Sequence, residues 1–129
     1  MNRPLHIIYV EDESDIRSVG TLALEANGAF RVRAYDNGVD AVRGACESPP
    51  DLVLADVLME GLDGEQTLAA LQARPETAYV PVIFITAQIN AADVARYRKL
   101  GAIGVIAKPF DPRTLAAKVL AMLEAHRAS

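Results

Sequence analysis

The sequence predicts an α/β fold in which a five-stranded parallel sheet is doubly wound, with helices on both of its faces. The first observation behind this prediction is a set of short, continuous apolar runs, which are typical of strands buried in a parallel sheet. These runs occupy residues 7–10, 52–55, 82–85 and 103–107. The second observation is that segments with helical spacing lie between the runs, and this alternation indicates a parallel sheet wrapped by helices.

The remaining strand is predicted at residues 30–35, where apolar residues alternate with Arg31 and Arg33. One side of such a strand meets water, so we expect it at an edge of the sheet. The apolar runs at 7–10 and 52–55 then belong in the middle. With right-handed crossovers, this placement favours the flavodoxin-like strand order 2-1-3-4-5, in which strands 1 and 3 are neighbours where the winding reverses.

The first two helices are predicted at residues 14–27 and 37–47. Gly28 stands where a helix-ending glycine is expected. The apolar stripe of the first helix is Ile16, Val19, Ala23 and Ala26, and that of the second is Val39, Val42 and Cys46. On this stripe, Cys46 is interpreted as a small core residue and not as a redox centre.

The last three helices are predicted at residues 64–74, 90–100 and 112–126. Pro112 suits the first turn of the fifth helix, with Asp111 ahead of it as a cap. The fourth helix is mostly polar and should make the weakest core contact. The expected inward residues are Leu68 and Leu71, then Val94 and Tyr97, then Leu115, Ala116, Val119, Leu120, Met122 and Leu123.

Length and composition predict one compact domain over residues 1–129, with a core from about residue 5 to 126 and no output domain. The net charge of −4 argues against direct nucleic-acid binding. No apolar stretch approaches the roughly 20 residues that span a bilayer, and the start is not a signal peptide. A single cysteine fits a reducing compartment, so we expect a cytoplasmic protein.

Polar residues follow the apolar runs at their carboxyl ends. Glu11 and Asp12 follow the first run, Asp56 follows the second, and Thr86 and Lys108 follow the last two. Because parallel strands end at the same edge of a sheet, these side chains should converge where open α/β sheets bind their ligands.

Such a cluster of carboxylates favours a divalent cation. Two unit charges about 4 Å apart cost roughly 4 kcal/mol at an effective dielectric constant of about 20. Mg²⁺, or Mn²⁺ in its place, takes oxygen ligands and would relieve this repulsion. A metal, a lysine and a hydroxyl group can also stabilise a phosphoryl group, and carboxylates such as Asp56 do form aspartyl-phosphates.

Five stretches of the chain, in order and in spacing, resemble the receiver domains of two-component response regulators. They are residues 8–13, 51–59, 62–64, 81–87 and 108–110. No single stretch is diagnostic, but five in register are specific, and the resemblance covers nearly the whole chain. It implies that this module signals and is not an enzyme acting on other substrates.

The resemblance also implies roles for the site residues. Asp56 would accept a phosphoryl group, and Asp12, Asp56 and the backbone carbonyl of Leu58 would hold Mg²⁺, with Glu11 acting through a bound water. Lys108 would pair with Asp56 at rest and with the phosphoryl group afterwards, while Thr86 would swing toward that group.

Ala87 and Pro109 complete the motifs as auxiliary positions, and the Lys108–Pro109 bond resembles the family's cis peptide, which an X-Pro bond permits at low cost. The implied phosphodonor is a sensor histidine kinase or a histidine phosphotransfer protein. The implied recipient of the signal is a downstream protein target or an output domain. The switching face would comprise segments 90–100, 103–107 and 112–126, and the sequence leaves open whether it forms a homodimer.

Four positions depart from the family pattern. Val105 stands where many receivers carry Tyr or Phe. We interpret it as a strand residue that packs under the last helix. The alternative is that switching uses other parts of the face formed by segments 90–100, 103–107 and 112–126. Glu60 replaces a usual proline, so the loop should be less stiff. Leu58 and Gln88 occupy positions that, in the family, flank the path of the hydrolytic water. Because Leu58 cannot hydrogen-bond a water, we expect slow loss of the phosphoryl group.

Three other functions remain as alternatives. An aspartyl-phosphate phosphatase commonly carries a second acid two residues after the nucleophile, where this chain has Leu58. An unphosphorylated receiver-like scaffold normally lacks the acceptor or the metal acids, which are present here. A flavin or nucleotide module of the same fold would need a phosphate-binding loop, and neither common glycine motif occurs.

Overall fold

A computed structural model describes residues 3–59 and 61–128 of the chain. Five parallel strands form one sheet in the order β2-β1-β3-β4-β5, as predicted. The strands are β1 (Leu5–Val10), β2 (Phe30–Tyr35), β3 (Leu52–Asp56), β4 (Val82–Thr86) and β5 (Gly104–Ala107). The helices are α1 (Ser14–Glu25), α2 (Gly38–Glu47), α3 (Gly64–Gln72), α4 (Ala91–Leu100) and α5 (Leu115–Ala128).

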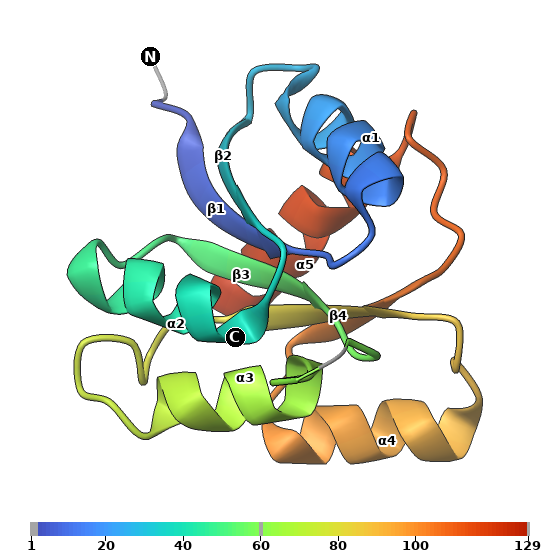
Figure 1. The fold of residues 1–129 in the computed structure, drawn as a ribbon. Coiled ribbons are helices and arrows are strands. Elements are labelled where there is room, and N and C mark those ends of the chain that lie inside the picture. The colour runs from blue at the N-terminus through green and yellow to red at the C-terminus, as the bar shows by residue number, and fades with distance from the viewer. Residues whose placement is uncertain (1–2, 60, 129) are drawn as a thin grey trace.

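The sheet lies between two layers of helices (Figure 1). One core cluster joins it to α2, α3 and α4 and includes Leu68, Phe84 and Tyr97. The other joins it to α1 and α5 and includes Leu24 and Val119. Successive residues of a strand point to opposite faces. Because helices cover both faces of the sheet, the central strands β3 and β4 are buried along their whole length.

The strand β2 lies at an edge, as its alternating pattern predicted, and pairs in parallel with β1 alone. Arg31 and Ala34 on this strand are exposed, whereas Phe30 is buried against α1 and the sheet. This arrangement leaves β1 and β3 adjacent in the middle of the sheet. Glu11 and Asp12, which follow β1, and Asp56, which ends β3, are thereby brought to the same end of the molecule.

The predicted faces of α1 and α2 were partly wrong. Val19 is 45% exposed and Val39 is 54% exposed, and Ala26 lies beyond the end of α1 in an exposed position. Ala23 and Val42 are buried as predicted, and the other buried residues are Gly20 and Leu24 in α1 and Gly38, Ala41 and Ala45 in α2. The small residues let the helices approach the sheet closely. The face that packs on the sheet is therefore turned away from Val19 and Val39.

The helix ends also differ in detail from the prediction. The regular part of α5 begins at Leu115, three residues after the predicted start at Pro112. Asp111 caps the turn that precedes it, since its Oδ1 accepts a hydrogen bond from Arg113 N at 2.9 Å. Cys46 is half-buried at the edge of the core cluster, consistent with a packing role. The prediction for Glu60 falls outside the described residues.

None of the helices in the described part of the chain combines the length and the apolar character needed to cross a membrane.

Candidate functional site

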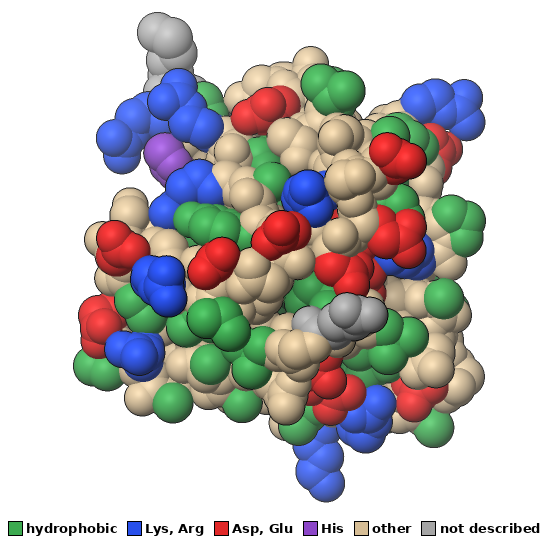
Figure 2. All heavy atoms as spheres, in the orientation of Figure 1, with side chains coloured by type: hydrophobic (Ala, Val, Ile, Leu, Met, Phe, Trp, Pro, Cys, Tyr) green, Lys and Arg blue, Asp and Glu red, His purple; other side chains and the backbone are tan. Residues whose placement is uncertain are grey.

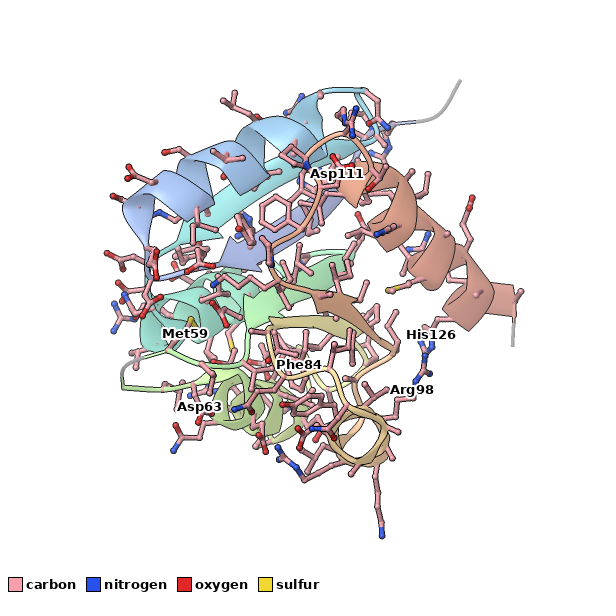
Figure 3. The ribbon with its side chains drawn as sticks, turned by 90° about the vertical axis from the view of Figure 1, so that its right-hand side faces the viewer. Met59, Asp63, Phe84, Arg98, Asp111 and His126 are labelled. Atoms are coloured by element: carbon pink, nitrogen blue, oxygen red, sulfur yellow. The ribbon has the colours of Figure 1, made fainter. Side chains whose placement is uncertain are left out.

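The carboxyl ends of the strands gather polar side chains into one site, as their order along the chain predicted. Glu11, Asp56 and Thr86 are almost completely buried there, with exposed fractions of 1%, 3% and 1%. Figure 3 shows the molecule from this end: Met59 and Asp63 mark the loop after β3, whereas His126 lies away from that loop at the end of α5. His6 and His126 are both exposed and take no part in the site.

Three carboxylates of the site are close enough to share one cation. Glu11, Asp12 and Asp56 each offer an oxygen, and these oxygens all lie within 4.8 Å of one another. Asp12 is exposed to solvent, so a hydrated ion could approach from its side. Figure 2 shows acidic side chains gathered on this part of the surface, next to Lys and Arg side chains. A hard cation that prefers oxygen ligands and keeps several waters fits this donor set.

Lys108 is the cation that the site itself provides. Its Nζ donates a hydrogen bond to Glu11 Oε1 at 3.0 Å and a second, shorter one to Asp56 Oδ2. Burial alone would lower the pKa of Lys108, but its hydrogen bonds to Asp56 and Glu11 raise the pKa above its ordinary value. The amine therefore stays charged and partly neutralises the acids.

Glu11 is held from both sides of its carboxylate. In addition to the bond from Lys108, its Oε2 accepts a hydrogen bond from Glu13 N at 3.1 Å. Burial raises the pKa of Glu11, whereas the hydrogen bonds from Glu13 and Lys108 oppose that rise. The charged form of Glu11 thus depends on its partners, and it would be favoured further by an incoming cation.

The loop after β3 places Asp56 and Leu58 together. Leu58 N donates to Asp56 Oδ1 at 3.0 Å, and the Leu58 side chain is 58% exposed. Gly64, the first residue of α3, lies so close that a Cβ atom there would stand 2.6 Å from the carbonyl oxygen of Asp56. Asp63 and Gln66 form a capping box that starts α3 at this point. The close approach of α3 therefore requires glycine at position 64.

Thr86 ends β4 with its hydroxyl group already engaged. Its Oγ1 accepts a hydrogen bond from Gln88 N at 3.0 Å, and Ala87 and Gln88 are exposed. The threonine thus holds the start of the loop that leads to α4. Any movement of its hydroxyl toward Asp56 would release that loop.

The interpretation that Val105 packs under the last helix is wrong. Val105 is half-buried and packs against the cluster formed by α2, α3 and α4, which contains Phe84 and Tyr97. The reason is the alternation along β5: Ile106 and Gly104 face α5, where a Cβ on Gly104 would meet Met122. The residue between them must face α4.

The Lys108–Pro109 peptide bond is cis, as the resemblance implied. Pro109 is exposed, and the half-buried Phe110 packs against the core cluster of α1 and α5.

Two residues near the site, Arg17 and Tyr9, have roles that the sequence did not indicate. Arg17 of α1 donates from Nη1 to the backbone carbonyl of Glu11 at 2.9 Å. Tyr9 is fully buried, and its hydroxyl has no partner in the described residues. Away from the site, Tyr97 is fully buried, as its inward placement predicted, and it packs edge-to-face on Phe84 with ring centroids 5.4 Å apart. The sequence did not reveal these roles of Arg17 and Tyr9, because one residue acts through the backbone and the other through packing.

The sequence model of the response regulator receiver domain matches residues 7–120 of the chain. The chain belongs to this family. The match contains every residue of the site, from Glu11 to Lys108. The receiver domain thus has the fold and the family that the spacing of its motifs indicated.

Receiver domains of known regulators are similar to this one in sequence. The transcriptional regulatory protein CseB of Streptomyces avermitilis is 34% identical over 123 residues, which are 95% of this chain and 51% of that protein. The phosphate regulon regulatory protein PhoB of Escherichia coli is 36% identical over 119 residues, 91% of this chain and 51% of PhoB. The receiver chain therefore spans about half the length of these relatives.

Solved structures agree on the fold. A putative response regulator from Chloroflexus aurantiacus has a TM-score of 0.84 and 28% identity, covering 94% of this chain and 98% of that one. The chemotaxis protein CheY4 of Vibrio cholerae has a TM-score of 0.85 at 23% identity, covering 92% and 98%, and this likeness concerns the fold alone.

Proposed function

We propose that this receiver domain accepts a phosphoryl group on Asp56 from a phosphohistidine of a sensor histidine kinase or a histidine phosphotransfer protein. The observation that carries this proposal is the buried carboxylate of Asp56, which shares one site with two further acids and is hydrogen-bonded to Lys108. A carboxylate so placed can attack phosphorus while the surrounding groups stabilise the transferred charge.

In the transfer, a carboxylate oxygen of Asp56 forms a bond to phosphorus as the bond between phosphorus and the histidine nitrogen breaks. The electron pair of the broken bond stays on the imidazole. Lys108, which pairs with Asp56 before transfer, can then donate to a phosphoryl oxygen. Thr86 can exchange its bond to Gln88 N for a bond to the same group.

Mg²⁺ fits the donor set, and Asp12, Asp56 and the backbone carbonyl of Leu58 would hold it, with Glu11 acting through a water. Mn²⁺ would serve in its place, because it too prefers carboxylate and water ligands. When bound, the ion neutralises negative charge that develops on the phosphoryl oxygens. The protein supplies the rest, since Lys108 and the buried walls of the site are already in place.

The signal would leave through the face formed by α4, β5 and α5, in the cytoplasm, to a downstream protein or an output domain. The chain would act as a signalling module and catalyse only its own phosphorylation and slow dephosphorylation.

An apolar groove of about 250 Å³ opens directly beside Lys108 and would seat the phosphodonor. It is lined by Asp15, Ile16, Val19, Lys108, Pro109, Phe110 and Pro112.

The test is incubation with acetyl phosphate and Mg²⁺, followed by intact-mass measurement. We expect the wild type to gain one phosphoryl group and Asp56→Asn to gain none. Glu76→Gln, which changes an exposed acid in the turn after α3, is the control and should be labelled normally. Labelling that survives in Asp56→Asn would refute the assignment of Asp56, and equal labelling after chelation would refute the need for a metal.

A further inference from the structure

Arg17 of α1 contacts the loop that carries the metal-binding acids, although it contacts none of their carboxylates. Its side chain is half-buried, and Nη1 donates to the carbonyl oxygen of Glu11 at 2.9 Å. The helix that carries Arg17 is anchored on the same loop, because Arg17 N donates to the Glu13 carbonyl oxygen at 2.9 Å. Arg17 thus reaches back across one helical turn to the end of β1.

The carbonyl that Arg17 holds belongs to the peptide unit between Glu11 and Asp12. A peptide unit is planar, so fixing its carbonyl oxygen fixes the orientation of the whole plane. That plane joins the Cα atoms from which the two acidic side chains leave. On its other side Glu11 is fixed by its own N–H, which donates to the Tyr35 carbonyl oxygen at 3.0 Å.

Asp12 depends on this peptide more than the other acids do. The carboxylates of Glu11 and Asp56 are tied by Lys108 and by the backbone N–H groups of Glu13 and Leu58. The Asp12 carboxylate makes no hydrogen bond or ion pair within residues 3–59 and 61–128 and is exposed. Among the described residues the backbone alone therefore sets where its Cα–Cβ bond starts and points, and Arg17 holds that backbone.

We propose that Arg17 is a positioning residue for Mg²⁺ binding, acting through the Glu11–Asp12 peptide. This inference rests on the proposed function, because it assumes that the acids bind Mg²⁺. Arg17 would favour Mg²⁺ binding through the hydrogen bond that aligns Asp12. Its positive charge would not favour binding.

Charge and position predict opposite effects, and this makes the proposal testable. A guanidinium beside the site repels a divalent cation, so loss of its charge alone should tighten Mg²⁺ binding by about two- to fivefold at low salt. Loss of an outer-shell group that orients a ligand weakens metal binding, typically by about 10–100-fold. We expect the second effect to win, with a net weakening of about tenfold.

The experiment compares Arg17→Met, Arg17→Lys and the wild type. Methionine keeps an apolar stem of similar length but has no donor, whereas lysine keeps a donor and the charge. Arg17→Ala is a second variant without a donor, in case Arg17→Met fails to fold. The matched control is Arg98→Met, which removes an exposed arginine of α4 (Figure 3). Each protein is titrated with Mg²⁺ alone by calorimetry, and its urea unfolding is measured without Mg²⁺.

We expect Arg17→Met to raise the Mg²⁺ dissociation constant about tenfold, and Arg17→Lys to stay within about threefold of the wild type. Arg98→Met should leave the constant unchanged. A merely structural role would lower the unfolding free energy without changing Mg²⁺ affinity of the folded protein. Affinity that is unchanged or tighter in Arg17→Met, or equally weak in Arg17→Lys, would overturn the proposal. A wild type that binds no Mg²⁺ would instead refute the proposed function itself.

Discussion

Tyr9 shows how a single buried residue links the acid site to the stability of the fold. Its ring lies against Gly20 of α1, where even a Cβ atom would collide with the phenol, and its hydroxyl has no partner in the described chain. Burial, and then the nearby charges of Glu11 and Asp56, raise the pKa of Tyr9 above its ordinary value of 10.0.

The sign of the resulting pH dependence follows from that direction. Below pH 10 the phenol is neutral in both the folded and the unfolded chain. As the pH rises above 10, the unfolded chain loses this proton first, so the free energy of unfolding falls. Lys108, whose pKa is also raised, acts in the same direction from its ordinary value of 10.5.

We predict that Tyr9→Phe makes the unfolding free energy less sensitive to alkaline pH. The variant removes the Tyr9 phenol, one of the two alkaline-titrating groups named above, and also a buried hydroxyl that has no partner among the described residues. At pH 8 it should therefore be as stable as the wild type or more stable. Urea unfolding between pH 8 and 11 measures this dependence. Tyr79→Phe, at a position that is 70% exposed, is the control. An equally steep decline in Tyr9→Phe would contradict the prediction.

Leu58 sets a second expectation at the scale of one residue. Its side chain is 58% exposed beside Asp56 and has no polar atom to orient a hydrolytic water. We predict slow decay of the phosphorylated protein in Mg²⁺ without a partner, and decay in Leu58→Asn that is faster by about three- to tenfold, or about 0.7–1.4 kcal/mol. Leu58→Met is the apolar control. Loss of phosphate within a few seconds in the wild type would contradict this prediction.

The sequence was informative about side chains that act directly and uninformative about those that act through the backbone. Asp56, Thr86 and Lys108 could be predicted because each directly follows an apolar run, and parallel strands bring such positions together. Arg17 could not be predicted, because its target is a carbonyl group, which every residue possesses. The partner of such a donor is decided only by the path of the chain.

At the scale of elements, α4 is held to the sheet through few contacts. Tyr97 is its only buried residue within the described chain, and it packs edge-to-face on Phe84. Two polar contacts connect α4 to α3: Arg96 pairs with Glu65 at 2.6 Å, and Gln72 donates to the Leu100 carbonyl oxygen at 3.2 Å. An element with one buried anchor can shift more readily than its neighbours.

We predict that Tyr97→Ala costs about 3–5 kcal/mol of unfolding free energy, as large-to-small changes of buried aromatic residues do. Tyr97→Phe should stay within about 1 kcal/mol of the wild type, because the lost hydroxyl is buried without a partner. Chemical denaturation measures both variants, and Tyr79→Ala at an exposed position is the control. A large loss of stability in Tyr97→Phe would show that the hydroxyl does have a partner, contrary to the packing described here.

The elements also show where apolar periodicity misleads. The sequence placed Val19 and Val39 inward, because large apolar residues usually mark the buried face of a helix. In the structure most of the buried positions on these helices are Ala or Gly, together with Leu24 and Val42, whereas Val19 and Val39 are exposed. Periodicity identifies that a helix is amphipathic, but the closeness of its approach to the sheet decides which residues are covered. Val105 in β5 is a similar case, because the strand register decided which side of the sheet its side chain faces.

At the scale of the whole molecule, the strand order that brings the acids together also imposes a cost on the fold. Only Lys108 forms ion pairs with the trio Glu11, Asp12 and Asp56 among the described residues. Negative charge therefore remains in excess at the site before a cation binds. A cation that binds the folded state alone stabilises it in proportion to the logarithm of its concentration.

We predict that Mg²⁺ at about 100 times its dissociation constant raises the unfolding free energy of the wild type by about 2.7 kcal/mol. Asp12→Ala should respond differently. Without Mg²⁺ its unfolding free energy should exceed that of the wild type by about 0.2–1 kcal/mol, because an exposed like charge is gone. Adding Mg²⁺ should not raise the unfolding free energy of this variant. Asp15→Ala removes the same charge from α1 but leaves the trio intact, so it should keep the full response to Mg²⁺. Urea unfolding with and without Mg²⁺ measures all three proteins. An Asp12→Ala variant that is stabilised by Mg²⁺ as strongly as the wild type would mean that the ion binds elsewhere, and the link between strand order, charge and cation binding would then fail.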